Sequence, residues 1–209
     1  MENLAKQADV LFLQETHGDV HHMATLLPRL ASKFFVHSSP CENLAAGGVI
    51  TMIAKKWAGD QCEIGSEALC RGRVVRTVVR CGGKAVALWN VHNFGIGGPD
   101  RQTIGERLRA DTRAARGSPL DSVVILGGDM NFASDDGAGG RAAGPRDGQR
   151  FWEGALASCT GIAPTAATHY FATENRYTAI DRVYTSLPNW ALVNLHVAAR
   201  VSDDPIVLF

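Results

Sequence analysis

The segment LDSVVILGGDMNF, residues Leu120 to Phe132, decides the fold expected for this chain. Within it, Ser122 to Leu126 is a short run of mainly β-branched apolar residues, with a proline before it and two glycines after it, which predicts a buried strand. Asp129 and Asn131 follow just beyond the carboxyl end of that strand, where open α/β sheets build their binding sites. The alternative is that both residues only mark a turn after a strand.

Four further segments accompany this one in a fixed order and favour a functional interpretation. The five are ADVLFLQETH (8–17), LWNVHN (88–93), ILGGDMN (125–131), AIDRVYTS (179–186) and VSDDPIVLF (201–209). In this order they resemble the endonuclease/exonuclease/phosphatase superfamily, most closely its retrotransposon-encoded and apurinic-site endonuclease branch. Since they span nearly the whole chain, the resemblance implies one domain over residues 1–209.

The fold that the resemblance implies is a four-layer α/β sandwich, in which two mostly antiparallel β-sheets lie face to face and helices flank them. Strand-rich segments joined by glycine turns are compatible with this architecture. The usual first strand of the family carries an Asn in a phrase resembling N-x-N, and no such segment precedes the strand predicted at 10–14. We therefore expect an N-terminally truncated domain, in which the core strand next to the missing one presents an unpaired edge.

Other elements follow from local patterns. Residues 48–53 predict a strand, with 74–79 as a candidate partner, and the turn CGGK predicts that 74–79 forms a hairpin with 85–90. Apolar residues near helical spacing predict an amphipathic surface helix over 101–116, and a shorter helix is expected over 151–158.

The resemblance assigns a role to each candidate site residue. Glu15, directly after the first predicted strand, would hold Mg²⁺, with Mn²⁺ as a possible substitute, because hard cations prefer carboxylate oxygen. Asp129 would position or deprotonate the attacking water, and Asn131 would donate a hydrogen bond to the phosphoryl oxygens. His92 would donate a second hydrogen bond to the phosphate. Asp181 matches a carboxylate that orients an imidazole supplied by the last motif of the family, S-D-H.

That last motif is altered, because the chain reads SDDP at residues 202–205 and has no imidazole there. Asp181 would then face another carboxylate, and like charges at short range raise a pKa and repel a phosphate. Alternatively, Asp203 and Asp204 could join Glu15 as metal ligands and leave a slower, metal-dependent hydrolase. His169 or His196 could also replace the missing imidazole, although His196 is better explained as a structural residue.

Composition leaves several functions open. Lys+Arg and Asp+Glu both number 21, so the chain lacks the overall basic charge of a strong nucleic-acid binder. Arginines gather in 71–80 and again in 101–116, and we interpret both runs as solvated faces. The first hypothesis is a Mg²⁺-dependent, retroelement-derived endonuclease that acts on DNA and is weak or degenerate. A phosphatase of phosphorylated small molecules and a catalytically inactive binding domain are the alternatives.

The five cysteines are odd in number and show no CxxC spacing, which argues against a disulfide framework or zinc site and favours a reducing compartment. The first residues show no signal-peptide pattern, and no apolar run is long enough to span a bilayer. We therefore expect a soluble intracellular protein with no membrane partner.

Overall fold

The computed structural model describes residues 8–17, 21, 25, 28, 30–41, 46–132, 146–162, 169–171, 176–178, 180–192, 197–198 and 207–208. The strands of its first part are β1 (Val10–Gln14), β2 (Phe34–Ser39), β3 (Val49–Ala54), β4 (Glu63–Cys70), β5 (Val74–Cys81), β6 (Lys84–His92) and β7 (Ser122–Asp129). Those that follow are β8 (Thr160–Ile162), β9 (His169–Phe171), β10 (Arg176–Thr178), β11 (Asp181–Thr185), β12 (Val197–Ala198) and β13 (Val207–Leu208). The helices are α2 (Lys55–Ala58), α3 (Gly98–Gly117), α4 (Arg146–Ala155) and the 3-10 turn η2 (Asn189–Ala191).

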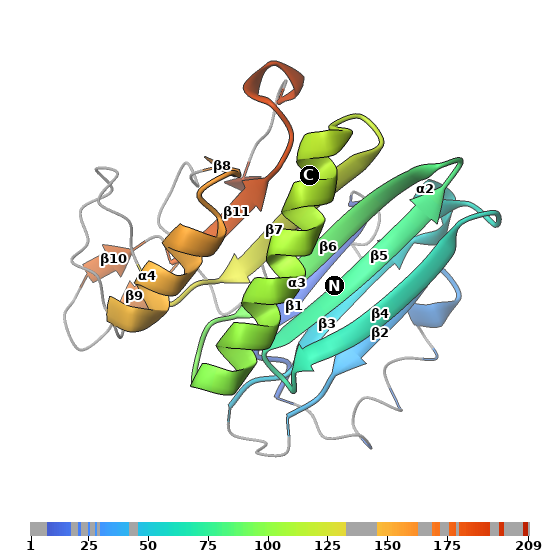
Figure 1. Ribbon diagram of the computed structural model, residues 1–209. Coiled ribbons are helices and arrows are strands. Elements are labelled where there is room, and N and C mark those ends of the chain that lie inside the picture. The colour runs from blue at the N-terminus through green and yellow to red at the C-terminus, as the bar shows by residue number, and fades with distance from the viewer. Residues whose placement is uncertain are drawn as a thin grey trace.

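Two large sheets form the centre of the molecule (Figure 1). One has five strands in the order β12-β13-β1-β3-β2, and the other has six in the order β4-β5-β6-β7-β11-β8. β9 and β10 form a separate two-stranded sheet. Among the described strands, only β6 and β7 pair in parallel, and α3 makes the crossover between them. The mostly antiparallel α/β sandwich predicted from the sequence is therefore confirmed.

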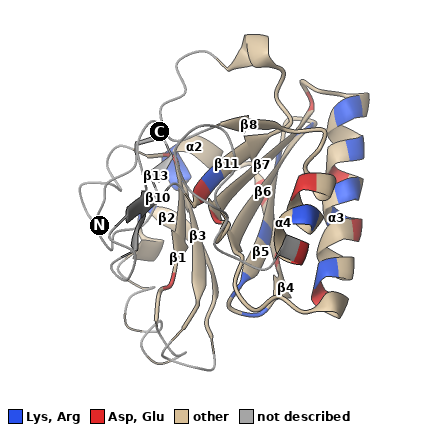
Figure 2. Cartoon of the chain, turned by 90° about the vertical axis from the view of Figure 1, so that its left-hand side faces the viewer, with Lys and Arg blue, Asp and Glu red and all other residues tan. Residues whose placement is uncertain are grey.

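Three apolar clusters hold the layers together. Phe12 and Ile53 of the five-stranded sheet meet Val79 and Leu88 of the six-stranded sheet in the interior of the sandwich. The opposite face of the six-stranded sheet packs under α3 and α4, around the fully buried Trp89. Figure 2 shows the two sheets edge-on, with both helices on the outer side of the larger sheet. The third cluster covers the outer face of the five-stranded sheet.

The buried side-chain amide of Asn90 links the two sheets near the carboxyl ends of β1 and β6. Asn90 of β6 donates its Nδ2 to the carbonyl of Ile50 at 2.8 Å and to that of Leu13 at 3.3 Å. Its Oδ1 accepts a 2.6 Å hydrogen bond from Nε2 of Gln14. Because these bonds satisfy polar groups in a dry interface, they fix the end of β1 against β6. Glu15 follows β1 directly, so the same bonds bring Glu15 close to the end of β6.

The pairing of β7 with its neighbours brings three candidate residues into register. His92 is the partner of Asp129 in the parallel β6–β7 pair, and Asp181 is its partner in the antiparallel β7–β11 pair. Gly128 has φ 147°, and a Cβ there would lie 1.9 Å from the carbonyl oxygen of Val91. Only glycine permits this close approach of the two backbones. β7 therefore stays paired with β6 beyond the apolar run, as far as Asp129.

The strand, the hairpin and the longer helix predicted from local patterns are all present in the structure. The strand at 10–14 is β1, the hairpin of 74–79 with 85–90 is formed by β5 and β6, and the helix at 101–116 lies within α3. The helix expected over 151–158 begins earlier, because α4 covers Arg146–Ala155. The pairing of 48–53 with 74–79 is wrong, because β3 pairs with β1 and β2 in the other sheet.

β1 is not an edge strand. It pairs with β3 on one side and with β13 on the other, where Leu11 is the partner of Val207. The edges of this sheet, among the described strands, are β12 and β2. The unpaired core edge expected from the sequence is therefore not found at β1.

Candidate functional site

Asp129 is a partly buried carboxylate whose acidity is strongly perturbed. Burial raises its pKa to about 7, the negative charges of Asp181 and Glu15 act in the same direction, and the backbone N–H of Asn131 acts against them. That N–H donates to Oδ1 of Asp129 at 2.7 Å. A general base works best when its pKa lies near the working pH. Asp129 therefore has the acidity of a group that could accept a proton from water near neutrality.

Asn131 presents a hydrogen-bond donor that the surrounding protein does not use. Its Nδ2 is buried and has no hydrogen-bond partner among the described residues. Its backbone lies in the left-handed region, with φ 51°. A buried N–H without a partner costs free energy, and such groups are rare unless a ligand or ordered water completes them. The side chain is thus suited to donate to an incoming acceptor such as a phosphoryl oxygen.

His92 is 1% exposed and lies between Arg73 and Glu15. Nη1 of Arg73 is 2.8 Å from Nδ1 of the imidazole, and a guanidinium can only donate, so Nδ1 is the acceptor. The ring proton must then reside on Nε2, which lies 3.3 Å from Oε1 of Glu15. The pKa of His92 is lowered to about 4, first by burial and then by the positive charge of Arg73, while the negative charge of Glu15 acts in the opposite direction. His92 is therefore a neutral imidazole with a single donor, directed at Glu15.

Backbone strain is concentrated at this end of the sheets. Three non-glycine residues among those described have positive φ, namely Glu15 (49°), His17 (43°) and Asn131 (51°). Glu15 and His17 follow β1, whereas Asn131 follows β7. Such conformations cost free energy and persist where the surrounding structure imposes them, often at functional sites. Hydrogen bonds from Thr16 and His17 to the carbonyls of Gly48 and Gly47 hold the first of these two loops in place.

Glu15 carries the carboxylate that the sequence motifs assigned to a divalent cation. Its carboxylate is 53% exposed, and its second oxygen lies 3.4 Å from Nε2 of His17. No group of three His, Cys, Asp or Glu side chains within the described ranges is arranged to hold a metal. Mg²⁺ nevertheless keeps several waters and needs only one or two carboxylates. The neighbouring negative charges that raise the pKa of Asp129 are those that such a cation would neutralise.

The structure brings together Glu15, His92, Asp129, Asn131 and Asp181, which the sequence motifs had singled out. Asp203, Asp204 and His196 lie outside the described residues, and for His169 only the backbone, in β9, is described.

Sequence reasoning missed Arg73. The arginine run at 71–80 was interpreted as a solvated face, but Arg73 contacts His92, and Arg76 donates to both oxygens of Asp111 and to Glu67. That interpretation is wrong for these two residues. Nothing in their spacing distinguishes them from the exposed Arg71 and Arg80.

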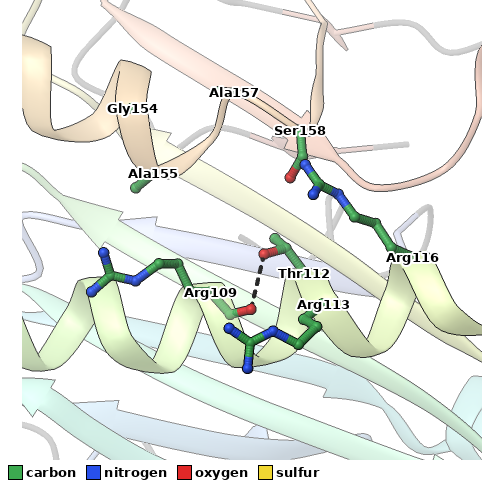
Figure 3. A pocket seen from close by; sticks show the side chains of 8 residues that line it. All are labelled: Arg109, Thr112, Arg113, Arg116, Gly154, Ala155, Ala157 and Ser158. Atoms are coloured by element: carbon green, nitrogen blue, oxygen red, sulfur yellow. Dashed lines mark hydrogen bonds between the residues drawn. The ribbon is translucent and has the colours of Figure 1, made fainter.

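A hollow of about 240 Å³ lies elsewhere, between α3 and α4 (Figure 3). α3 lines it with three arginines and a threonine, and α4 and the turn after it line it with small residues; the set is Arg109, Thr112, Arg113, Arg116, Gly154, Ala155, Ala157 and Ser158. No carboxylate or imidazole lines it. Because α3 leads into the start of β7, this hollow is remote from Asp129, which ends the same strand. Its arginines give a basic face without the groups needed for hydrolysis.

Together, the two-sheet sandwich and the carboxylate, amide and imidazole groups at one end of it define a DNase I-like α/β fold with a polar site. The sequence profile of the Endonuclease/Exonuclease/phosphatase family matches residues 2–203, and the chain belongs to this family. No curated protein sequence matches the chain. No helix in the described part of the chain is long and apolar enough to cross a bilayer.

Solved structures support the same fold. The crystal structure of the AP endonuclease LMAP from Leishmania major is similar to this chain with a TM-score of 0.74 and 16% identity, covering 98% of this chain and 78% of that one. TDP2 from D. rerio, complexed with a single-strand DNA product, is similar with a TM-score of 0.52 and 17% identity, covering 99% and 84%. A humanized D. rerio TDP2 is similar with a TM-score of 0.53 and 16% identity, covering 94% of this chain and 77% of that one. At these identities the likeness establishes the fold.

Proposed function

We propose that this protein is a divalent-metal-dependent hydrolase of phosphodiesters in nucleic acid, derived from a retroelement endonuclease and reduced in activity. The observation that carries this proposal is the pairing of two complementary groups at the end of β7. Asp129 has a pKa near neutrality, and two residues further on Asn131 holds a buried amide N–H that no described residue accepts. One group can take a proton from water, and the other can donate to an oxygen on which negative charge develops.

The remaining residues position these two. Glu15 would hold Mg²⁺ or Mn²⁺, which when bound would neutralise charge on the phosphate. His92, neutral and protonated on Nε2, supplies a hydrogen-bond donor beside Glu15. Arg73 fixes that tautomer through Nδ1. Together with burial, the negative charge of Asp181 raises the pKa of Asp129.

The reduced activity follows from the last motif. Residues 202–205 read SDDP and include no imidazole that Asp181 could orient. Asp203 and Asp204 add negative charge where the family has a histidine, and this would repel the phosphate unless a cation compensates. A catalytically inactive binding domain is the limiting case of this loss.

The experiment that tests the proposal is nicking of supercoiled plasmid with Mg²⁺, beside an EDTA control. Asp129→Ala should abolish the nicking, whereas Asp121→Ala, which removes an exposed carboxylate in the turn before β7, should retain it. Nicking that needs both the metal and Asp129 would support hydrolysis at this site. No nicking by the unmodified protein at any metal concentration would overturn hydrolysis of DNA and leave the inactive binding domain or the phosphatase as the function.

The formal net charge of zero is the one observation that favours a phosphatase of small molecules instead. The two enzymes differ in how salt affects them. Binding to a nucleic acid releases counterions, so its affinity should fall steeply with salt. Arg73→Gln should reduce that salt dependence, whereas Arg113→Gln, in the remote hollow, should not. Turnover of a phosphomonoester without salt-dependent DNA binding would favour the phosphatase.

A further inference from the structure

An exposed aromatic ring is held rigidly at the edge of this site. Phe94 is 56% exposed, although it follows the buried His92 by only two residues. Its N–H donates to the carbonyl of His92 at 2.8 Å. The neighbouring Asn93 is fixed to β7 and the loop after it, because its N–H donates to the carbonyl of Asp129 at 2.8 Å and its Nδ2 to that of Met130 at 2.7 Å. The position of the ring is therefore tied to the strand that ends in the candidate base.

A guanidinium and an imidazole lie beside the exposed ring of Phe94. Cζ of Arg73 lies 5.1 Å from the ring centroid of Phe94. The ring of His92 lies 6.1 Å away and is tilted by only 18°. Since Arg73 and His92 are hydrogen-bonded to each other at 2.8 Å, both must lie on the same side of Phe94. No other described aromatic ring or cation contacts Phe94, and more than half of the residue's surface is exposed.

We propose that the exposed ring of Phe94 is a stacking platform for an unpaired nucleobase of the substrate. Every base has a π-face, and aromatic rings bind unpaired bases by stacking with little regard to sequence. A base is joined to its phosphate through one sugar, and Phe94 adjoins the residues proposed to act on that phosphate. In a duplex both faces of a base are already stacked. The platform therefore favours a single strand or a base that has left the helix.

The setting argues against a protein partner at the same place. The ring is an isolated exposed aromatic beside the guanidinium of Arg73, whereas protein-binding surfaces are contiguous apolar patches of several hundred Å². A single aromatic face beside cationic and amide groups matches the base, sugar and phosphate of one nucleotide. This inference rests on the proposed function, since it assumes a nucleic-acid substrate.

The test compares the affinity for a fluorescently labelled single-stranded oligonucleotide with that for a duplex of the same length, in EDTA so that no strand is cut. Phe94→Ala should weaken binding of the single strand by about 5- to 150-fold. Binding of the duplex should change much less. Phe94→Trp should retain the affinity for the single strand. Trp190→Ala is the matched control, because Trp190 is 71% exposed in η2, beyond the end of β11 remote from Asp181.

The possible outcomes distinguish failure of the stacking platform from failure of the proposed hydrolase function. If the unmodified protein binds the single strand and Phe94→Ala binds it equally well, the stacking platform is ruled out while the hydrolase proposal stands. An equal loss for single strand and duplex would also overturn it, since a ring that only supports Arg73 would weaken both. If neither nucleic acid binds to the unmodified protein, the proposed function fails and the platform fails with it.

Discussion

Asp181 lies directly opposite Asp129 across the antiparallel pair of β7 and β11. Side chains at such positions are neighbours on one face of a sheet, and like charges there are unfavourable. Burial, together with the charge of Asp181, raises the pKa of Asp129 to about 7. The pair therefore couples the protonation of the site to the stability of the whole domain.

The first prediction concerns this coupling. The folded-state pKa of Asp129 lies above that of an unfolded carboxyl, about 4, so between these values the folded state holds a proton that the unfolded state has lost. The contribution of Asp129 to stability is thus complete below pH 4 and is lost as the pH rises through about 7. Asp129→Asn should gain about 1 to 4 kcal/mol of stability relative to the unmodified protein between pH 4 and pH 8.

Urea denaturation at a series of pH values measures this difference. Asp121→Asn, which changes an exposed carboxylate near the start of the same strand, should follow the unmodified protein throughout. A pH profile of Asp129→Asn parallel to that of the unmodified protein would contradict the predicted coupling.

The second prediction concerns metal binding at Glu15. Mg²⁺ that binds only the folded state should raise the melting temperature, and at about 100 times its Kd it should add roughly 2.7 kcal/mol. Glu15→Gln should remove most of this increase, because an amide oxygen is a weaker ligand than a carboxylate. Glu106→Gln, an exposed change on α3, should keep it. Equal Mg²⁺-dependent shifts in both variants would exclude Glu15 as a ligand.

The third prediction concerns the altered last motif. Insertion of His between Asp203 and Asp204 restores the S-D-H order of the family and should raise plasmid nicking by about 10²- to 10⁴-fold, the usual contribution of a positioned acid or base. Insertion of Asn at the same point changes the spacing without adding a titratable group and should give no gain. Equal activities of the two insertions would mean that the missing imidazole does not limit hydrolysis.

The fourth prediction concerns the approach of β6 and β7. Gly128→Ala places a Cβ 1.9 Å from the carbonyl oxygen of Val91, at a backbone angle that L-residues rarely adopt. We expect a loss of at least about 3 kcal/mol, or failure to fold. Gly65→Ala, in β4, has nothing within 4 Å of the new Cβ and should change stability by less than about 1 kcal/mol. Chemical denaturation of the two variants compares these costs, and similar values would show that β6 and β7 can separate freely.

Several elements could be predicted from the sequence because their signals are local. β1, β7 and the β5–β6 hairpin each combine a short apolar run with a glycine turn or an adjacent site residue. The pairing partner of β3 could not be predicted, since alternation tells which face is buried and not which strand lies beside it. β3 and β5 do meet, through Ile53 and Val79, but across the interior of the sandwich and not edge to edge.

The candidate site likewise contains residues that could be predicted from the sequence and one that could not. The order of the motifs was enough to select Glu15, His92 and Asp129, which the fold then places at one end of the sandwich. Arg73 could not be selected, because its contact with Nδ1 of His92 depends on the bend between β4 and β5 and on no pattern in the chain. β4 also escaped prediction, since its sequence EIGSEALC contains no continuous apolar run and includes a glycine.

The single parallel pair among the described strands has a consequence for how this protein reaches its active form. β4, β5 and β6 are joined by short turns and can associate early, whereas β7 can join β6 only after α3 has formed the crossover. Glu15 and Asp181 come from nearly opposite ends of the sequence, and both must also be brought close to Asp129 at the end of β7. Contacts of such high sequence separation form slowly, so the candidate site would be completed among the last events of folding.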